Sequence, residues 1–169
     1  MATADTVAPA EAAALRVAAA FRTIEDRSMR GLPLCNSTLA VETVGFREHE
    51  GHAVGVLVTP WLMSLVAVPL APDGPLAGAR AGDVVALAVP SGALDLVANV
   101  VEGCGPLGTA SLFSPMDEFD PETARLAAGA AIAVLFDPEL LTPPAPAPKA
   151  LDRRALLRGR LVDSGRPTP

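Results

Sequence analysis

The chain has 169 residues, half of them apolar, with a mean hydropathy of +0.38 and a formal net charge of −6. This length suits one domain with tails, and the apolar content supports a core without disulfides or metals and excludes disorder over most of the chain. Residues 1–142 carry −10, seven Arg against seventeen acidic residues, and residues 143–169 carry +4, six basic against two acidic, which argues against nucleic-acid binding by the acidic body.

The N-terminal part predicts a flexible start followed by a helix. Residues 1–8 lack the basic and apolar regions of a secretory signal, so we expect a cytoplasmic protein with reduced thiols. From Pro9, which suits a first helical turn, apolar residues recur at helical spacing until about Arg27. These residues are Ala14, Val17, Phe21 and Ile24. The helix should end before Gly31.

Short apolar segments bounded by Gly, Pro or Asp then predict five strands joined as antiparallel hairpins. Their ranges are 39–48, 54–59, 62–69, 84–89 and 94–101. Residues 53–72 form an uncharged run close to membrane-spanning length. Pro60 in its middle and the β-branched residues before it favour two buried strands broken at Thr59-Pro60, so we expect no membrane span. Residues 103–108 are predicted to form a loop.

Asp120-Pro121-Glu122 marks the start of a second helix, with an N-cap, Pro at the first position and an acid in the first turn. Asp137-Pro138 should end it. Residues 9–142 are therefore predicted to form one domain, residues 143–150 a stiff Pro-rich linker, and residues 151–169 a basic tail. The fold class is α+β: an antiparallel sheet of about five strands flanked by two helices, with a Pro-linked C-terminal peptide.

Few residues point to catalysis or metal binding. Cys35 and Cys104 stand alone, without a CxxC pair or Cys/His ligand spacing. His49 and His52 share a predicted hairpin turn, where solvated side chains are favoured over a metal site. We therefore expect no metal, no cofactor and no enzymatic activity. The alternative from another class is a thiol-dependent enzyme that uses Cys104.

Two Pro-containing junctions hold residues typical of protein interfaces. Thr59–Met63 contains the only Trp, and Ser111–Met116 contains Phe and Met. Such side chains belong either to the core or to a groove. Capping accounts for Asp120 and Glu122, which leaves the neighbouring acids free to bind a guanidinium group. The candidate partner-binding residues are Pro60, Trp61, Met63, Phe113, Met116, Asp117, Glu118 and Phe119.

The sequence resembles the HybE family of [NiFe]-hydrogenase assembly chaperones, which includes the proteins called HupJ and HoxT. The resemblance covers roughly residues 32–137. It rests on Val41–Phe46, Gly55–Met63, Pro90–Gly92 and Ser111–Phe119, of which Thr-Pro-Trp and Ser-Leu-Phe-Ser-Pro-Met are the specific strings. The sequence departs from the family pattern at Ser64 and Ala110, where family members often have Asn and Cys, so no polar role is carried over to these two positions.

The resemblance implies a non-catalytic role in hydrogenase maturation in the cytoplasm. The implied partner is the [NiFe]-hydrogenase small-subunit precursor with its twin-arginine export signal. Further candidate partners are the large subunit and other maturation proteins. An alternative implied role is that of a scaffold subunit in a maturation complex that protects metal clusters from oxygen. The acidic body agrees with a basic signal peptide as ligand.

The C-terminal tail repeats the order of a twin-arginine motif, in which two Arg are followed by any residue, Phe and Leu. The corresponding residues are Arg153, Arg154, Leu156 and Leu157. At the C-terminal side of the chain this motif cannot act as an export signal. Two hypotheses remain: an ordinary basic tail, or a mimic that occupies the protein's own signal-peptide site at high effective concentration.

Overall fold

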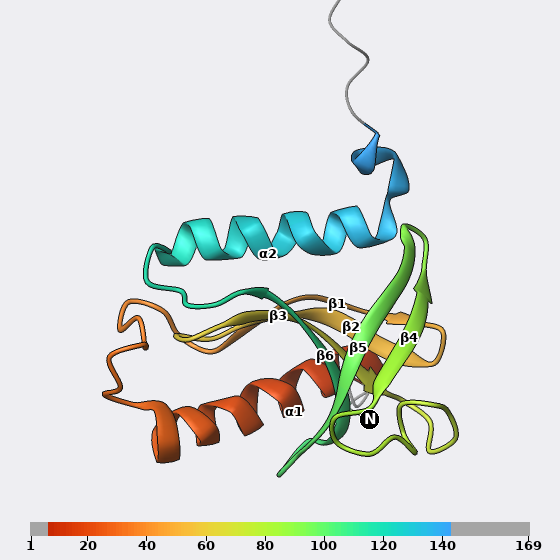
Figure 1. Cartoon of the computed structure of the whole chain (residues 1–169), viewed down its shortest axis with the longest axis horizontal. Coiled ribbons are helices and arrows are strands. Elements are labelled where there is room, and N and C mark those ends of the chain that lie inside the picture. Colours follow the sequence, from red (N-terminus) through yellow and green to blue (C-terminus); the bar gives the residue numbers. More distant parts are fainter. Residues whose placement is uncertain (1–6, 143–169) are drawn as a thin grey trace, which may run out of the picture.

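The computed structural model describes residues 7–142, which form an antiparallel sheet between two helices (Figure 1). Six strands are present in this part of the chain, in the order β1-β2-β3-β6-β5-β4. The helices are α1 (Pro9–Ile24), α2 (Pro121–Phe136) and two short turns, η1 (Glu25–Met29, π-helical) and η2 (Pro138–Leu141, 3-10). The strands are β1 (Glu42–His49), β2 (His52–Val58), β3 (Met63–Pro69), β4 (Val84–Val89), β5 (Gly92–Val101) and β6 (Gly105–Phe113). The α+β class predicted from the sequence is confirmed. The predicted linker and tail lie outside the described residues.

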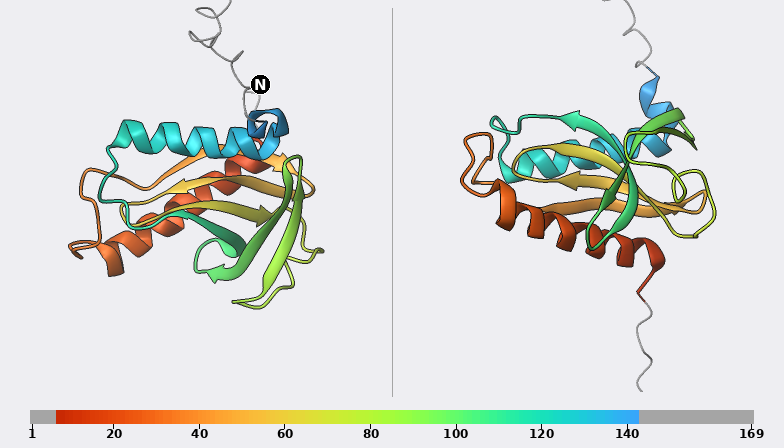
Figure 2. Two further views of the ribbon diagram at one scale, coloured as in Figure 1. Left: turned by 45° about the horizontal axis from the view of Figure 1, so that its top comes forward. Right: turned by 60° about the horizontal axis from the view of Figure 1, so that its bottom comes forward.

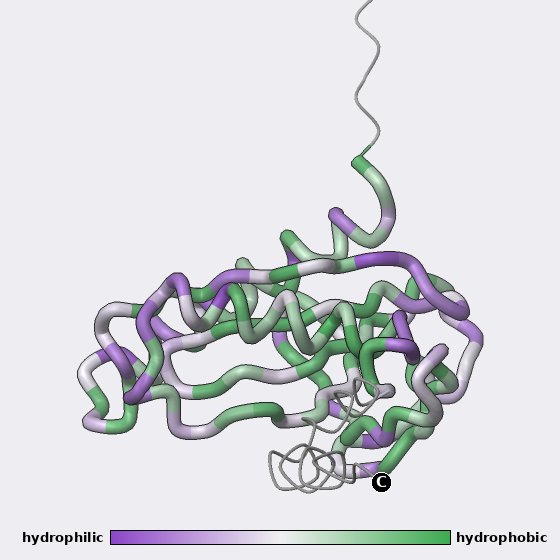
Figure 3. Tube along the Cα trace, turned by 90° about the horizontal axis from the view of Figure 1, so that it is seen from above, coloured by the Kyte–Doolittle hydropathy of each residue, from purple (hydrophilic) through white to green (hydrophobic). Residues whose placement is uncertain are grey.

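The two helices cover opposite faces of the sheet (Figures 1 and 2). Helix α2 packs against one face through Ala124, Ala128, Ile132 and Leu135. Helix α1 packs on the other face over β1 and β2, through Ala13 and Val17 among others. Its many alanines favour the helix and let it approach the strands closely. Hydrophobic residues consequently run through the middle of the trace, and hydrophilic ones gather mainly at its ends and turns (Figure 3).

The uncharged run at residues 53–72 becomes two central strands, β2 and β3, as predicted. Nearly every residue of both strands is buried, because a helix or a neighbouring element covers each face. Strand β4, by contrast, alternates between exposed and buried residues because only one of its faces is covered. No helix among residues 7–142 has both the length and the apolar character needed to cross a membrane.

Strand β6 was not predicted, because residues 103–108 had the composition of a loop. Only the turn at Glu102–Cys104 is irregular, and β6 starts at Gly105 and pairs with both β3 and β5. The close packing around position 108 leaves no room for a side chain, so a glycine is required there. A Cβ atom at this position would lie 2.9 Å from the Cβ of Leu96 and 3.0 Å from the Cδ1 of Leu76. The glycine therefore marks close packing inside a strand and not a turn.

The sheet is strongly twisted, and its two outer strands meet at one point. Nε2 of His49 in β1 donates a hydrogen bond to the carbonyl oxygen of Ala88 in β4, 2.7 Å away. The His49 ring also packs edge-on against Phe136 at the end of α2, with 5.2 Å between the ring centroids. This histidine, which the sequence placed in a solvated turn, therefore joins the two edges of the sheet to α2.

A loop-built aromatic and acidic patch

Three connections meet at one end of the sheet, on the left in Figure 1. They are the segment 30–41 after η1, the β2–β3 turn at 59–62, and the segment 114–120 between β6 and α2. The backbone N–H of Asn36 donates to the carbonyl oxygen of Pro60 at 2.8 Å. The hydroxyl of Ser114 donates to the carbonyl oxygen of Trp61 at 3.4 Å. These bonds make the three connections one unit.

The β2–β3 turn is held by the buried hydroxyl of Thr59. This oxygen accepts hydrogen bonds from the backbone N–H groups of Trp61 (3.3 Å) and Leu62 (3.0 Å). It also donates to the carbonyl oxygen of Leu62 at 2.9 Å, and the N–H of Thr59 donates to the same oxygen at 2.9 Å. The side chain thus satisfies buried backbone groups that the sheet leaves unpaired. Thr59-Pro60 therefore forms a rigid corner.

Asn36 fixes the segment that leads into α2. Its side-chain amide donates to the carbonyl oxygens of Met116 (2.8 Å) and Phe119 (2.7 Å). Its side-chain oxygen accepts from the N–H and hydroxyl of Thr38. The Asn-Ser-Thr sequence is typical of such a local turn, but it gives no sign of the contacts with residues far along the chain. Asn36 was not among the predicted site residues.

Four of the eight predicted partner-binding residues are buried. Met63 and Met116 are fully buried, Trp61 exposes 8% of its surface, and Pro60 is also buried. Met63 and Met116 belong to the larger core cluster, and the burial of all four side chains makes them unavailable to a partner in this structure. The structure thus places them in the core, which was one of the two alternatives that the sequence left open.

The other four residues form a surface patch, called here the aromatic–acidic patch: Phe113, Asp117, Glu118 and Phe119. Phe113 exposes 45% of its surface. Its ring packs on that of the half-buried Phe119 with 5.1 Å between centroids. Asp117 and Glu118 are exposed, and neither takes part in an ion pair among residues 7–142. Two exposed leucines, Leu32 and Leu34, lie in the neighbouring connection that Asn36 anchors.

Two other acidic residues near the patch have structural partners. Asp120 caps α2: it accepts hydrogen bonds from the backbone N–H (2.8 Å) and the hydroxyl (2.9 Å) of Thr123, which lower the pKa of its carboxyl group. Arg125 of α2 donates two hydrogen bonds, 2.8 and 2.6 Å long, to the carboxylate of Glu42 in β1. This bidentate pair lowers the pKa of Glu42 and attaches the start of α2 to the sheet. No such structural partner is present for Asp117 or Glu118 among residues 7–142.

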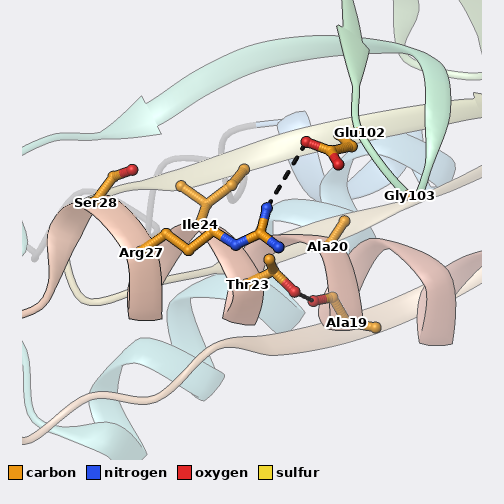
Figure 4. Close-up of a pocket in the computed structure, with 8 residues that line it drawn as sticks. All are labelled: Ala19, Ala20, Thr23, Ile24, Arg27, Ser28, Glu102 and Gly103. Carbon is orange, nitrogen blue, oxygen red and sulfur yellow. Dashed lines mark hydrogen bonds and ion pairs between the residues drawn. The ribbon is translucent and has the colours of Figure 1, made fainter.

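A hollow of about 510 Å³ lies between α1 and the β5–β6 turn and carries little chemistry. Its lining includes alanines, short hydroxyl residues and an ion pair (Figure 4). That pair, Arg27 and Glu102, is long at 3.9 Å and highly exposed. Cys104 lies in the same turn but does not line the hollow, and burial raises the pKa of its thiol. Within the described part of the chain, no three His, Cys, Asp or Glu side chains are grouped as metal ligands would be.

The fold and the patch together define an α+β protein whose distinctive surface suits contact with another chain. Comparison with known proteins gives the family. Residues 12–159 match the model of the family described as "[NiFe]-hydrogenase assembly, chaperone, HybE". The chain therefore belongs to the HybE family of [NiFe]-hydrogenase assembly chaperones, and the match is wider than the resemblance seen in residues 32–137.

Individual relatives agree. The chain is 39% identical over 152 residues to the hydrogenase expression/formation protein HupJ of Bradyrhizobium diazoefficiens, covering 87% of this chain and 88% of HupJ. It is 31% identical over 147 residues to the hydrogenase-2 operon protein HybE of Escherichia coli K12, covering 86% and 88% of the two chains. The solution structure of HybE from Escherichia coli superposes with a TM-score of 0.58 at 24% identity, covering 93% of this chain and 91% of HybE. That likeness concerns the fold.

Proposed function

We propose that this protein is a non-catalytic chaperone of [NiFe]-hydrogenase maturation, which binds the small-subunit precursor in the cytoplasm close to its twin-arginine signal. The observation that carries the proposal is the aromatic–acidic patch. It combines two carboxylates without ion-pair partners in the described residues and an exposed pair of phenylalanine rings. The family supports the role in hydrogenase assembly; the partner and the binding site are inferred from the chemistry of the patch.

The patch matches a twin-arginine motif group by group. Carboxylates bind guanidinium groups through paired, charge-assisted hydrogen bonds. Aromatic faces attract guanidinium groups as well and also accept the apolar residues that follow the arginines. Asp117 and Glu118 would bind the two arginines, and Phe113 with Phe119 would contact the Phe and Leu after them. The residues 7–142 carry seven Arg against sixteen acidic residues, so the surrounding field also attracts a basic segment.

The test measures binding of a fluorescent synthetic peptide containing Ser-Arg-Arg-Ala-Phe-Leu-Lys to the full chain by anisotropy. The variant Asp117→Asn/Glu118→Gln should weaken binding about tenfold, which corresponds to ~1.4 kcal/mol. Asp73→Asn/Asp95→Asn changes the net charge equally but lies outside the patch, and it should leave the affinity within about twofold. Equal losses in both variants would show that only the overall charge matters and would overturn the assigned site.

The aromatic part of the patch is tested separately. Phe113→Ser should weaken binding, whereas Val100→Ser, a change at another exposed apolar residue, should not. In a pull-down from cytosolic extract, the same variants should lose the uncleaved small-subunit precursor. Recovery of other maturation proteins without the precursor would instead support the scaffold role. Trp61→Ala is unsuitable as a site variant because Trp61 is buried and its loss would disturb the core.

A further inference from the structure

Helix α2 has an outward face that is unusually apolar for a surface. The helix carries no charged residue between Arg125 and Asp137. Leu126 exposes 67% of its surface, and Ala130, one turn later on the same side, is exposed too. A helix that is apolar on all sides is normally covered on all sides. Within residues 7–142, this outer face is not covered.

The described chain ends at the opposite end of α2 from the aromatic–acidic patch. The patch lies just before Pro121, the first residue of α2, and η2 follows directly after its last turn. At that last turn the N–H of Ser91 donates to the carbonyl oxygen of Leu135 at 3.2 Å, next to the β4–β5 hairpin. With 16 residues, α2 is about 24 Å long. Figure 1 shows the two ends clearly separated.

The length and composition of the following segment match this distance. The ten residues 143–152 include four prolines, and in a polyproline II conformation ten residues span about 31 Å. A segment of this length that turns back can run the whole length of α2 towards the patch. Its prolines and alanines are uncharged, as is the face that it would cover. The family match continues to residue 159, so the segment belongs to the part of the chain that the family model describes.

We propose that residues 143–159 fold back along α2 and occupy the aromatic–acidic patch of the same molecule. Arg153 and Arg154 bind Asp117 and Glu118, and the leucines at 156 and 157 contact the two phenylalanine rings. The charges are complementary, since residues 143–169 carry +4. The inference rests on the proposed function, because it makes this segment a tethered competitor of the precursor. A short tether gives such a competitor a high effective concentration.

The contact itself is tested without any precursor. The amide resonances of Asp117, Glu118 and Phe119 are compared by NMR between the unaltered chain and the variant Arg153→Glu/Arg154→Glu. We expect these resonances to shift in this variant. They should stay in place in Lys149→Glu/Arg166→Glu, which changes the charge equally. Unmoved resonances in Arg153→Glu/Arg154→Glu would overturn the proposal. So would a shift that depends on protein concentration, because it would indicate the tail of a second copy.

The consequence for binding is tested with the twin-arginine peptide. Arg153→Glu/Arg154→Glu should bind the peptide several-fold more tightly than the unaltered chain does. Deletion of residues 143–147 should have the same effect, since it shortens the reach by about 16 Å, to less than the length of α2. A Gly/Ser linker of the original length should preserve most of the competition between the tail and the peptide.

Equal peptide affinity of the unaltered chain and both variants would overturn the fold-back and leave the proposed function intact. Absence of peptide binding in every variant would overturn the proposed function, and the NMR result would then decide the fold-back by itself.

Discussion

The side-chain amide of Asn36 donates a hydrogen bond to the carbonyl oxygen of Phe119, 2.7 Å away, although 83 residues separate the two in the sequence. A second bond from the same amide, to Met116, fixes the other end of the segment that carries Asp117 and Glu118. One side chain in the first third of the chain therefore positions the acidic part of the patch. Asn36 is half-buried, and both of its amide hydrogen bonds go to backbone carbonyl oxygens of this segment.

Asn36→Asp should weaken both the fold and binding of the twin-arginine peptide. A carboxylate has no N–H to donate and would face two carbonyl oxygens, so we expect a loss of about 1–3 kcal/mol in the free energy of unfolding. Urea unfolding and peptide anisotropy measure the two effects. Asn99→Asp, which removes the amide hydrogen bond to the carbonyl oxygen of Val97 elsewhere in the sheet, should change stability alone. Normal peptide binding by Asn36→Asp would contradict the positioning role.

Gly108→Ala should destabilise the sheet by about 1–3 kcal/mol, because the added methyl group would overlap Leu96 and Leu76 in a packed core. Gly129→Ala is the matched control on α2, where a Cβ atom meets nothing within 4 Å. There the substitution should stabilise by about 0.4–1 kcal/mol through helix propensity and a less mobile unfolded chain. Thermal unfolding of the two variants should therefore move in opposite directions. A neutral Gly108→Ala would show that β6 packs more loosely than described.

The Glu42–Arg125 pair predicts a pH-dependent part of the stability. The hydrogen bond from Arg125 lowers the pKa of Glu42 in the folded state, so folding favours the charged carboxylate. The contribution of the Glu42–Arg125 pair to the free energy of unfolding is fully present above the ordinary glutamate pKa of about 4.3. This contribution is lost as the pH falls through the lowered pKa of Glu42 in the folded state. At neutral pH, Glu42→Gln should cost up to about 1 kcal/mol, a small value because Arg125 is largely exposed.

Urea midpoints at neutral and acidic pH check this prediction. The difference in urea midpoint between the unaltered chain and Glu42→Gln should decrease steadily as the pH falls below about 4.3. Glu48→Gln, an exposed residue of the same strand without an ion pair among residues 7–142, should show no such trend. A difference that persisted unchanged in acid would mean that the pair does not act through the charge of Glu42.

Cys104 should be a slow nucleophile. Burial raises the pKa of its thiol, which lowers the thiolate fraction at neutral pH. In a Cys35→Ser background, alkylation of Cys104 by iodoacetamide should be slower than that of free cysteine. Cys104→Ser should bind the twin-arginine peptide normally and support hydrogenase maturation in cells. Loss of maturation in Cys104→Ser with normal folding and peptide binding would favour the thiol-dependent enzyme instead.

Local signals in the sequence predicted most of the fold. Asp120-Pro121 places the start of α2 because capping depends on neighbouring residues alone. The break between β2 and β3 follows from Thr59-Pro60 for the same reason. Strand β6 was missed because Gly105 and Gly108 are turn residues by local preference. The reason for Gly108 is its contact with Leu96 and Leu76, which only the folded sheet creates.

The candidate site was predictable in part. The strings around Trp61 and Phe113 identified two of the three connections that meet at the end of the sheet. Sequence alone could not separate the buried Met116 from the exposed Phe113, because irregular segments have no periodicity that assigns side chains to a face. The positioning role of Asn36 could not be predicted, because its partners are backbone carbonyl groups, which every residue type carries.

The bond between His49 and Ala88 has a consequence for the outer strand β4. Strand β4 is an outer strand without charge or proline, the kind of edge that recruits other extended chains through backbone pairing alone. His49 occupies the carbonyl oxygen of Ala88, near the end of the strand where β4 meets β1. At this position another extended chain would have to displace the imidazole before it could pair with β4. The imidazole therefore guards one position of this edge against pairing with other chains.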